Sequence, residues 1–173
     1  MRTVLGRWAG ALLLALAALT LPTHPASAAG IDVQCLGTFA RTFSPPATTT
    51  PQAITVTGTY TYGTCPIGST GTGAETVSVT LSCLTLGPGP AVTETVTWTD
   101  ATGGTSTIAW NVPVLVTGTV TATGTVTAGR YLGDTATRIT SGTSYYAGLP
   151  GCLLGTAPIT SATGLVDSLL LTN

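Results

Sequence analysis

Threonine or serine alternates with apolar residues through much of this chain. The clearest runs are ITVTGTYTY at 54–62, VSVTLSC at 77–83 and VTETVTWT at 92–99. Successive side chains of a β-strand point to opposite faces, so this period of two places apolar groups on one face and hydroxyls on the other. Threonine is also β-branched, which favours strands over helices. The pattern is typical of an antiparallel sheet with one face in solvent.

Gly- and Pro-rich turns divide this alternation at regular intervals. They predict eight strands, near residues 31–43, 53–64, 74–85, 91–99, 104–111, 114–128, 134–146 and 157–171. No helical period occurs after the first thirty residues. Regularly spaced strands favour a sandwich or a barrel, and we predict an all-β antiparallel β-sandwich of immunoglobulin-like architecture. Its unprotected edge strands would favour pairing with another chain.

The N-terminus has the features of a secretory signal peptide. Arg2 and Arg7 precede an apolar run at 9–21, and Ala26-Ser27-Ala28 forms an A-x-A cleavage pattern. The apolar run would span roughly 20 Å as a helix, which is short of a bilayer core of about 30 Å. We therefore predict a signal peptide at 1–28 and a single secreted domain at 29–173, either extracellular or associated with the cell wall.

The composition disfavours several classes of function. The only histidine, His24, lies in the predicted signal peptide, and all five basic residues are arginines. Residues 29–173 therefore lack the general base of common nucleophilic triads and the ligands of His-based metal sites. A net charge of −1 without a basic patch disfavours binding to nucleic acid or to an anionic membrane. No cofactor is predicted.

Four cysteines in an exported chain predict two structural disulfides. Zinc is disfavoured because no two of them have close C-x-x-C spacing. If the strands meander between two ends of the domain, Cys35 and Cys65 lie near one end and Cys83 and Cys152 near the other. We therefore expect the pairs Cys35–Cys65 and Cys83–Cys152, with the two other connectivities left open.

The few charged residues offer weak candidates for chemistry. Glu75 and Glu94 are the only glutamates, and a carboxylate pair is the minimum that a glycosidase needs. Glu94 shares the parity of its apolar neighbours, so partial burial would raise its pKa. We nevertheless interpret both as acids at strand edges that discourage aggregation. Calcium at Asp100, Asp134 or Asp167 is disfavoured because no loop concentrates enough oxygen ligands.

Arg130 and Asp134 flank an apparent turn, with Arg138 four residues further on. We interpret this group as a surface ion pair that holds a hairpin together, although an anion-binding site is an alternative.

The aromatic residues are the best candidates for binding. Tyr145 and Tyr146 are adjacent, so on a strand one of the two would face outward and could stack on a sugar. Tyr131 and Arg130 in the neighbouring turn are further candidates for a ligand site. Trp98 and Trp110 have the parity of apolar neighbours, which indicates core positions.

The segments VQCLGTFARTFSP (33–45), GTYTYGTCP (58–66), VTWTDATGGTSTIAW (96–110) and GTVTAGRYLGDTAT (124–137) resemble those of a group of small secreted bacterial proteins with four cysteines. The resemblance covers most of residues 29–173 and implies export and an all-β, disulfide-linked domain. It implies no activity and transfers no functional residue.

These observations favour a secreted, non-enzymatic protein that acts by surface contact with a cell-envelope glycan or another secreted protein, or as a structural component of the envelope. One alternative is a carbohydrate-binding module that uses exposed Tyr or Trp. Another is a protease inhibitor that presents the disulfide-braced segment 64–67. A glycan hydrolase that depends on Glu94 is the least favoured.

Overall fold

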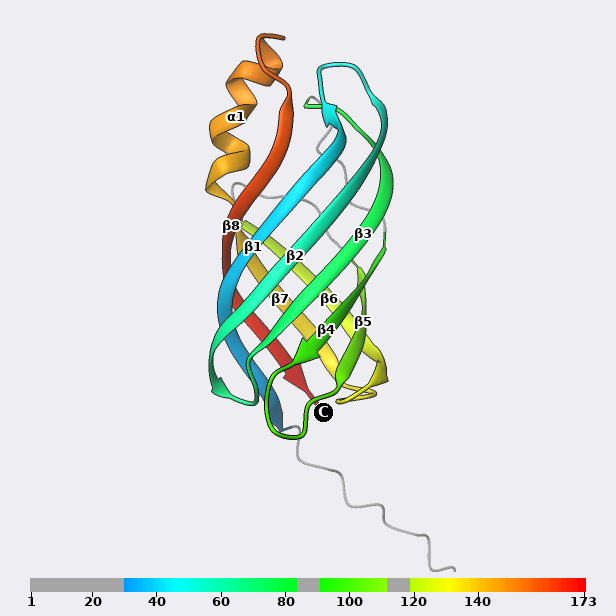
Figure 1. The fold of residues 1–173 in the computed structure, drawn as a ribbon, viewed down its shortest axis with the longest axis vertical. Helices are drawn as coiled ribbons and strands as arrows, with labels where there is room; N and C mark the ends of the chain where they lie inside the picture. Colours follow the sequence, from blue (N-terminus) through cyan, green and yellow to red (C-terminus); the bar gives the residue numbers. More distant parts are fainter. Residues whose placement is uncertain (1–29, 84–90, 112–118) are drawn as a thin grey trace, which may run out of the picture.

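The computed structural model describes residues 30–83, 91–111 and 119–173, apart from the side chains of Thr143, Tyr145 and Tyr146. Eight strands and one helix make up this part of the chain (Figure 1). In chain order they are β1 (Ile31–Ala47), β2 (Gln52–Ile67), β3 (Gly71–Leu81), β4 (Val92–Trp98), β5 (Thr105–Asn111), β6 (Thr119–Gly129), β7 (Thr135–Ser141), α1 (Thr143–Leu153) and β8 (Ile159–Thr172). The all-β antiparallel prediction is confirmed.

The strands close into a barrel, so the prediction of a sandwich with immunoglobulin-like architecture is wrong. Each strand pairs with its sequence neighbours, and β1 also pairs antiparallel with β8. The register of this closing seam includes Phe39 opposite Gly164 and Cys35 opposite Leu169. Because every described strand has a partner on both sides, the predicted open edges are absent from this part of the chain. The tilt of the strands about the long axis is visible in Figure 1.

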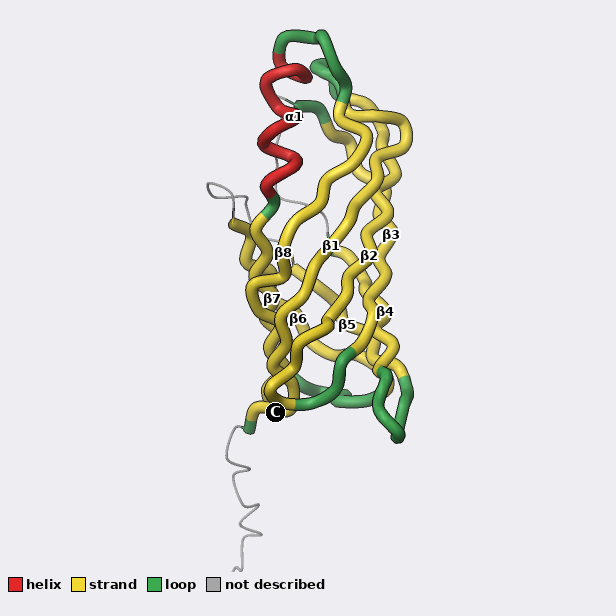
Figure 2. The backbone as a smooth tube through the Cα atoms, turned by 60° about the vertical axis from the view of Figure 1, so that its left-hand side comes forward, coloured by secondary structure: helices red, strands yellow, loops and turns green. Residues whose placement is uncertain are grey.

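The segment predicted as a strand at 134–146 contains a strand and the start of a helix. β7 ends at Ser141, and α1 begins at Thr143. Sequence periodicity gave no signal for α1, which contains Gly148, Pro150 and Gly151, residue types of low helix propensity. Tertiary contacts therefore hold it in place: α1 lies along β8 at one end of the barrel, as Figure 2 shows.

The two ends of the barrel differ, and we call them the base and the upper end. The base holds the start of β1, the end of β8 and the turns β2–β3, β4–β5 and β6–β7. The upper end holds α1 and the β1–β2 turn. The chain meanders between these ends, as expected from the sequence.

Apolar side chains and a few polar ones fill the barrel. The main core cluster includes Phe39, Tyr60, Tyr62, Trp98 and Trp110, all buried. Both tryptophans thus occupy the predicted core positions. A second cluster at the upper end contains Ile54, Val56, Ile159 and the Cys83–Cys152 pair. The exposed positions between these residues are mostly threonines, so the alternation in the sequence separates barrel interior from solvent.

Inward-facing glycines make room for the largest interior groups. A Cβ atom on Gly73 would overlap the carboxylate of Glu94, and one on Gly124 would lie 3.0 Å from the Trp110 ring. Gly124 is directly opposite Trp110 across β5 and β6. Such alternation of small and large side chains fits bulky groups into a narrow barrel.

Candidate functional site

The interior of the barrel contains a network of buried ion pairs. Glu75 on β3 and Glu94 on β4 are directly opposite each other and face inward. Arg138 on β7 joins them: its Nη1 lies 2.5 Å from Glu94 Oε2, and its Nη2 lies 3.4 Å from Glu75 Oε2. Arg41 on β1 adds a second cation, with Nη2 2.9 Å from Glu75 Oε1. We call these four residues the interior ion network.

Aromatic side chains complete the hydrogen bonding of the two carboxylates. Tyr60 donates to Glu75 Oε1 and Tyr62 donates to Glu94 Oε1, each at 2.6 Å. Trp110 Nε1 donates to Glu94 Oε2 at 2.7 Å. The Arg138 guanidinium also lies 4.0 Å from the Tyr60 ring centre and 4.6 Å from that of Trp110, within the range of cation–π attraction.

The environments of the two glutamates shift their pKa values in opposite directions. Burial opposes the ionisation of Glu75, but Arg41 and Arg138 outweigh it and lower its pKa. Burial raises the pKa of Glu94, and the nearby charge of Glu75 adds to this rise against the effect of Arg138. An acid and a base with separated pKa values are a feature of glycosidases.

The two glutamates are less accessible to solvent and substrate than the carboxylates of a glycosidase site. Glu94 is 0% exposed and Glu75 is 5% exposed. Retaining and inverting enzymes hold their carboxyl groups about 5 Å or more apart with a sugar between them, whereas here a guanidinium occupies that place. The interpretation of both glutamates as edge acids is therefore wrong, since they lie in the core. The parity of Glu94 was the signal that indicated burial correctly.

Arg41 is the member of the network nearest to solvent. Its side chain is 26% exposed, and its second contact is with the Tyr60 hydroxyl, to which Nη2 donates at 2.6 Å. Its Nε is buried without a hydrogen-bond partner. Sequence reasoning assigned no role to Arg41, although its parity matches the inward-facing residues Phe39 and Phe43 of β1.

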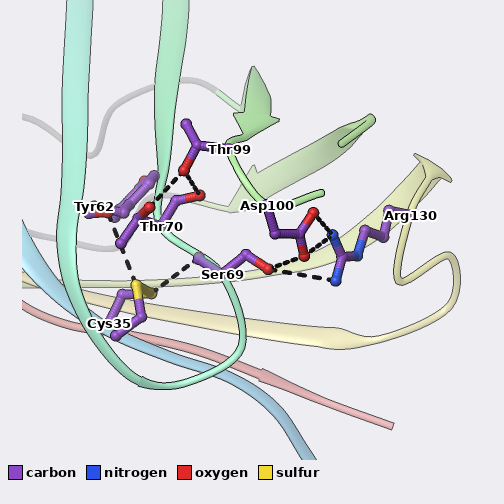
Figure 3. The surroundings of a disulfide bond; sticks show 8 residues. Cys35, Tyr62, Ser69, Thr70, Thr99, Asp100 and Arg130 are labelled. Atoms are coloured by element: carbon purple, nitrogen blue, oxygen red, sulfur yellow. Dashed lines mark hydrogen bonds and ion pairs between the residues drawn. A yellow bond between two sulfur atoms is a disulfide. The ribbon is translucent and has the colours of Figure 1, made fainter. Parts of the chain in front are cut away.

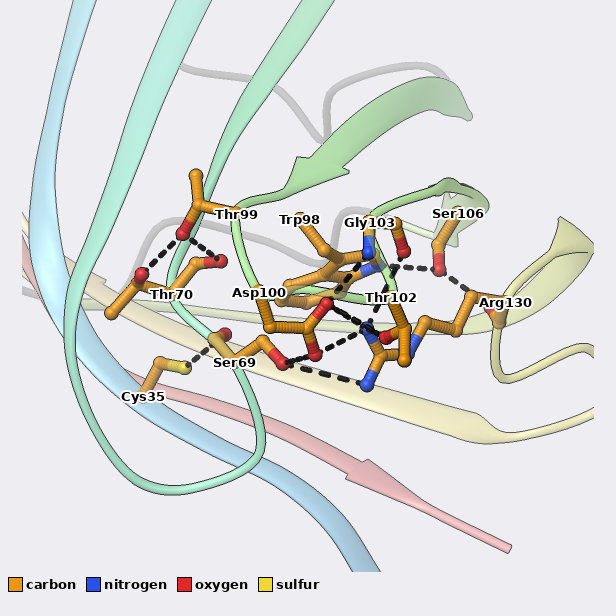
Figure 4. Close-up of polar contacts among 10 residues, drawn as sticks. All are labelled: Cys35, Ser69, Thr70, Trp98, Thr99, Asp100, Thr102, Gly103, Ser106 and Arg130. Atoms are coloured by element: carbon orange, nitrogen blue, oxygen red, sulfur yellow. Dashed lines mark hydrogen bonds and ion pairs between the residues drawn. The ribbon is translucent and has the colours of Figure 1, made fainter.

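A second polar cluster ties together three connections at the base (Figure 4). Arg130 Nη1 donates to both Asp100 oxygens, at 2.8 and 2.6 Å. Asp100 also accepts hydrogen bonds from Ser69, before β3, and from Thr102 in its own turn. Hydrogen bonds from Ser69 and Arg130 lower the pKa of Asp100.

The expected ion pair between Arg130 and Asp134 is therefore replaced by one between Arg130 and Asp100. Arg138, expected beside them on the surface, is 2% exposed inside the barrel. Sequence spacing suggested the wrong pairing because Arg130 and Asp134 are close along the chain, whereas Asp100 comes from the neighbouring β4–β5 turn.

Tyr131 follows Arg130 in the turn with φ of 62°, a left-handed conformation that is uncommon for residues other than glycine. Its ring packs edge-on against Trp98, with centroids 5.5 Å apart, and lies beneath the Arg130 guanidinium at 4.7 Å. One ring face is thus occupied by the neighbouring cation. The structure thus brings the predicted ligand-binding residues Arg130 and Tyr131 together, and the Arg130 guanidinium is already hydrogen-bonded within the protein.

Both predicted disulfides are confirmed. Cys35–Cys65 joins β1 to β2 at the base, and Cys83–Cys152 joins the end of β3 to α1. Figure 3 shows Cys35 beside the Ser69 carbonyl; the distance from Cys35 Sγ to the Ser69 carbonyl oxygen is 3.7 Å. The first disulfide therefore lies next to the Asp100–Arg130 cluster, and the second fixes the helix. Two disulfides indicate an oxidising compartment.

The other binding candidates are distributed as follows. Tyr145 and Tyr146 lie in α1 rather than on a strand, and their side chains are outside the described residues. The segment 64–67 is mostly exposed but belongs to β2, with Thr64 paired to Leu36 and Ile67 paired to Gln34. It is therefore not the free loop that a substrate-like inhibitor presents.

The outer wall of β1, β2 and β3 carries a regular array of small side chains, which we call the β1–β3 grid. All its members are exposed, and none is charged. Its cross-strand rows are Ser44–Thr55–Ser78, Thr42–Thr57–Thr76, Ala40–Thr59–Ala74 and Thr38–Thr61–Thr72. At one side of the grid, a shallow groove of about 560 Å³ crosses β8, β1 and β2 beside Ala40 and Leu165.

Residues 30–83, 91–111 and 119–173 contain no helix with the length and apolar character needed to cross a membrane. The same residues hold no group of three or more His, Cys, Asp or Glu side chains placed to bind a metal ion. No family model, curated protein or solved structure matches the chain.

Proposed function

We propose that this protein is a secreted, non-enzymatic β-barrel that acts through its outer wall, by contact with a hydroxyl-rich glycan of the cell envelope. The observation that carries the proposal is the distribution of polar groups. The interior ion network pairs its charges with one another, and only Arg41 in it is partly exposed, whereas the β1–β3 grid exposes uncharged hydroxyls.

The geometry of the grid supports a polymeric ligand. Neighbouring strands lie about 4.8 Å apart, and alternate residues along a strand lie about 6.7 Å apart, so the hydroxyls recur at short, regular intervals. Such an array can exchange many weak hydrogen bonds with a repeating glycan. The groove beside Leu165 adds a depression in which a chain can lie.

A module based on aromatic stacking has less support. Trp98, Trp110, Tyr60 and Tyr62 are each at most 3% exposed and therefore cannot stack on a sugar. Tyr131 packs against Trp98 and Arg130. The hydroxyl grid is thus the larger surface on which the described residues could contact a glycan.

The test is co-sedimentation with purified insoluble peptidoglycan. The variant T59R/T61R places long side chains on two adjacent rows of the grid, where both threonines also line the groove. The control T123R/T125R makes the same change on β6, four strands around the barrel, where both threonines are also exposed. We expect wild type and control to bind, and the grid variant to lose binding by tenfold or more, roughly 1.4 kcal/mol.

Absence of wild-type binding, or equal loss in both variants, would contradict the glycan proposal. Secretion is tested separately by the mass of the extracellular protein, which we expect to begin at Ala29.

A further inference from the structure

Two carboxylates meet at the base of the barrel, outside the interior ion network. Asp134 immediately precedes β7 and is 4% exposed. Its Oδ2 is buried and has no hydrogen-bond partner. Burial, and then contact with the side chain of Asp32 on β1, raise the pKa of this carboxyl group. Two ionised carboxylates have no proton to share, so this contact is unfavourable unless a cation or a proton lies between them.

The backbone directs Asp32 into this contact. Ile31 pairs with Thr172 and Val33 pairs with Leu171, so β1 advances by two residues where β8 advances by one. This register shift at Asp32 is a β-bulge, a feature that redirects side chains. Thr172 also pairs with Thr135, so the end of β8 separates β1 from β7 next to both acids.

The neighbouring cation does not neutralise the pair. Arg130 lies in the turn that leads to Asp134, but its guanidinium bonds to Asp100, Thr102 and Ser69. The site therefore keeps two acidic side chains and a buried carboxylate oxygen without a hydrogen-bond partner.

We propose that Asp32 and Asp134 bind a calcium ion at the base of the barrel. Carboxylate oxygens are hard ligands that suit Ca²⁺, and a site built by an irregular strand end tolerates its flexible geometry better than the strict octahedron of Mg²⁺. No third acidic group joins them among the described residues, so carbonyl groups and water complete the shell. Affinity is then in the range of extracellular modules, about 10⁻⁴–10⁻³ M.

The experiment measures thermal unfolding of the intact, disulfide-bonded protein at pH 7.5, in EDTA and then with excess Ca²⁺. At a Ca²⁺ concentration about tenfold above Kd, Tm rises by about 3–6 °C. D32N and D134N preserve shape and lose this shift. D167N removes an exposed carboxylate of β8 and keeps it. Because D134N relieves repulsion, it remains folded in EDTA.

Three results would overturn the calcium site. The first is an unchanged Tm in Ca²⁺, which would mean that the two acids share a proton instead. The second is a shift that survives in D134N. The third is an equal shift in Mg²⁺ or in NaCl of matched ionic strength, which would indicate screening rather than binding. None of these results bears on the glycan proposal, because the acids lie at the base and the grid lies on the wall.

Discussion

Removing the guanidinium of Arg138 should destabilise the barrel more than any other single charge change. In R138L, Glu94 remains 0% exposed and keeps its bonds to Tyr62 and Trp110, but loses its counter-charge at 2.5 Å. Removing one partner of a buried ion pair costs about 3–5 kcal/mol. For a domain of this size, that corresponds to a fall in Tm of about 6–20 °C.

The assay is urea unfolding followed by tryptophan fluorescence, with both disulfides intact. R130L is the matched control, because it removes an ion pair in which both side chains are about 30% exposed, and such pairs contribute about 0–1 kcal/mol. In the double variant R138L/E94L, the unpaired acid is also gone, so the free energy of unfolding recovers relative to R138L.

The effect of R138L also depends on pH. Burial raises the pKa of Glu94, so its ionised form destabilises the folded state once the pH exceeds the unfolded pKa. Without Arg138, the loss of stability is therefore largest at neutral pH and shrinks as the pH falls and the acid is protonated. If R138L were no more destabilising than R130L, or if the double variant were less stable than R138L, the assignment of a buried ion network would be refuted.

Three further predictions concern the core, the base and the helix. G73A should lower the free energy of unfolding by about 1–3 kcal/mol, because a methyl group there overlaps the interior carboxylate on β4. G63A should have little effect in the same urea assay, because its methyl group would lie 4.0 Å from the nearest neighbouring atom. Without added Ca²⁺, wild-type stability should rise as the pH falls from about 7 to 4, since the folded pKa of Asp134 is above its unfolded value; a D134N variant that keeps this slope would contradict the assignment. C83A/C152A should cost about 2–4 kcal/mol and speed hydrogen exchange in α1 more than in β2, and unchanged exchange would argue against a fixing role.

The barrel places its charges contrary to the usual arrangement. Four of its charged residues form the interior ion network, and the β1–β3 grid is uncharged. Buried ion pairs add little stability on average, because desolvation offsets their attraction. Here the network also selects a register: a shift of one residue on β3 would turn Glu75 to the outer wall and leave Arg41 and Arg138 with one acid fewer.

Several features followed from local sequence because they depend on local physics. The period of two in 54–62 and 92–99 predicted which side chains are buried, including Trp98, because successive residues of a strand face opposite sides. The same parity placed Trp110 of β5 in the core. Because the strands meander between the two ends of the barrel, each cysteine lies at the same end as its partner. The pairing of Cys35 with Cys65 could therefore be predicted.

Closure of the sheet was decided only by tertiary structure. A sandwich and a barrel both bury one face of every strand, so the same alternation is compatible with either. What separates them is the pairing of β1 with β8, and its partners, such as Phe39 and Gly164, are far apart in the chain. Helix α1 likewise depends on contact with β8 and on the Cys83–Cys152 bond.

The interior ion network required the same long-range information. Parity placed Glu94 on the inner face, but the partner that makes its burial tolerable, Arg138, comes from a strand 44 residues away. The order of residues thus determined which side of each strand meets water, because that is a property of neighbouring peptide units. Only the closed barrel decided which inward groups meet one another, because that depends on how strands distant in the chain are arranged around a common axis.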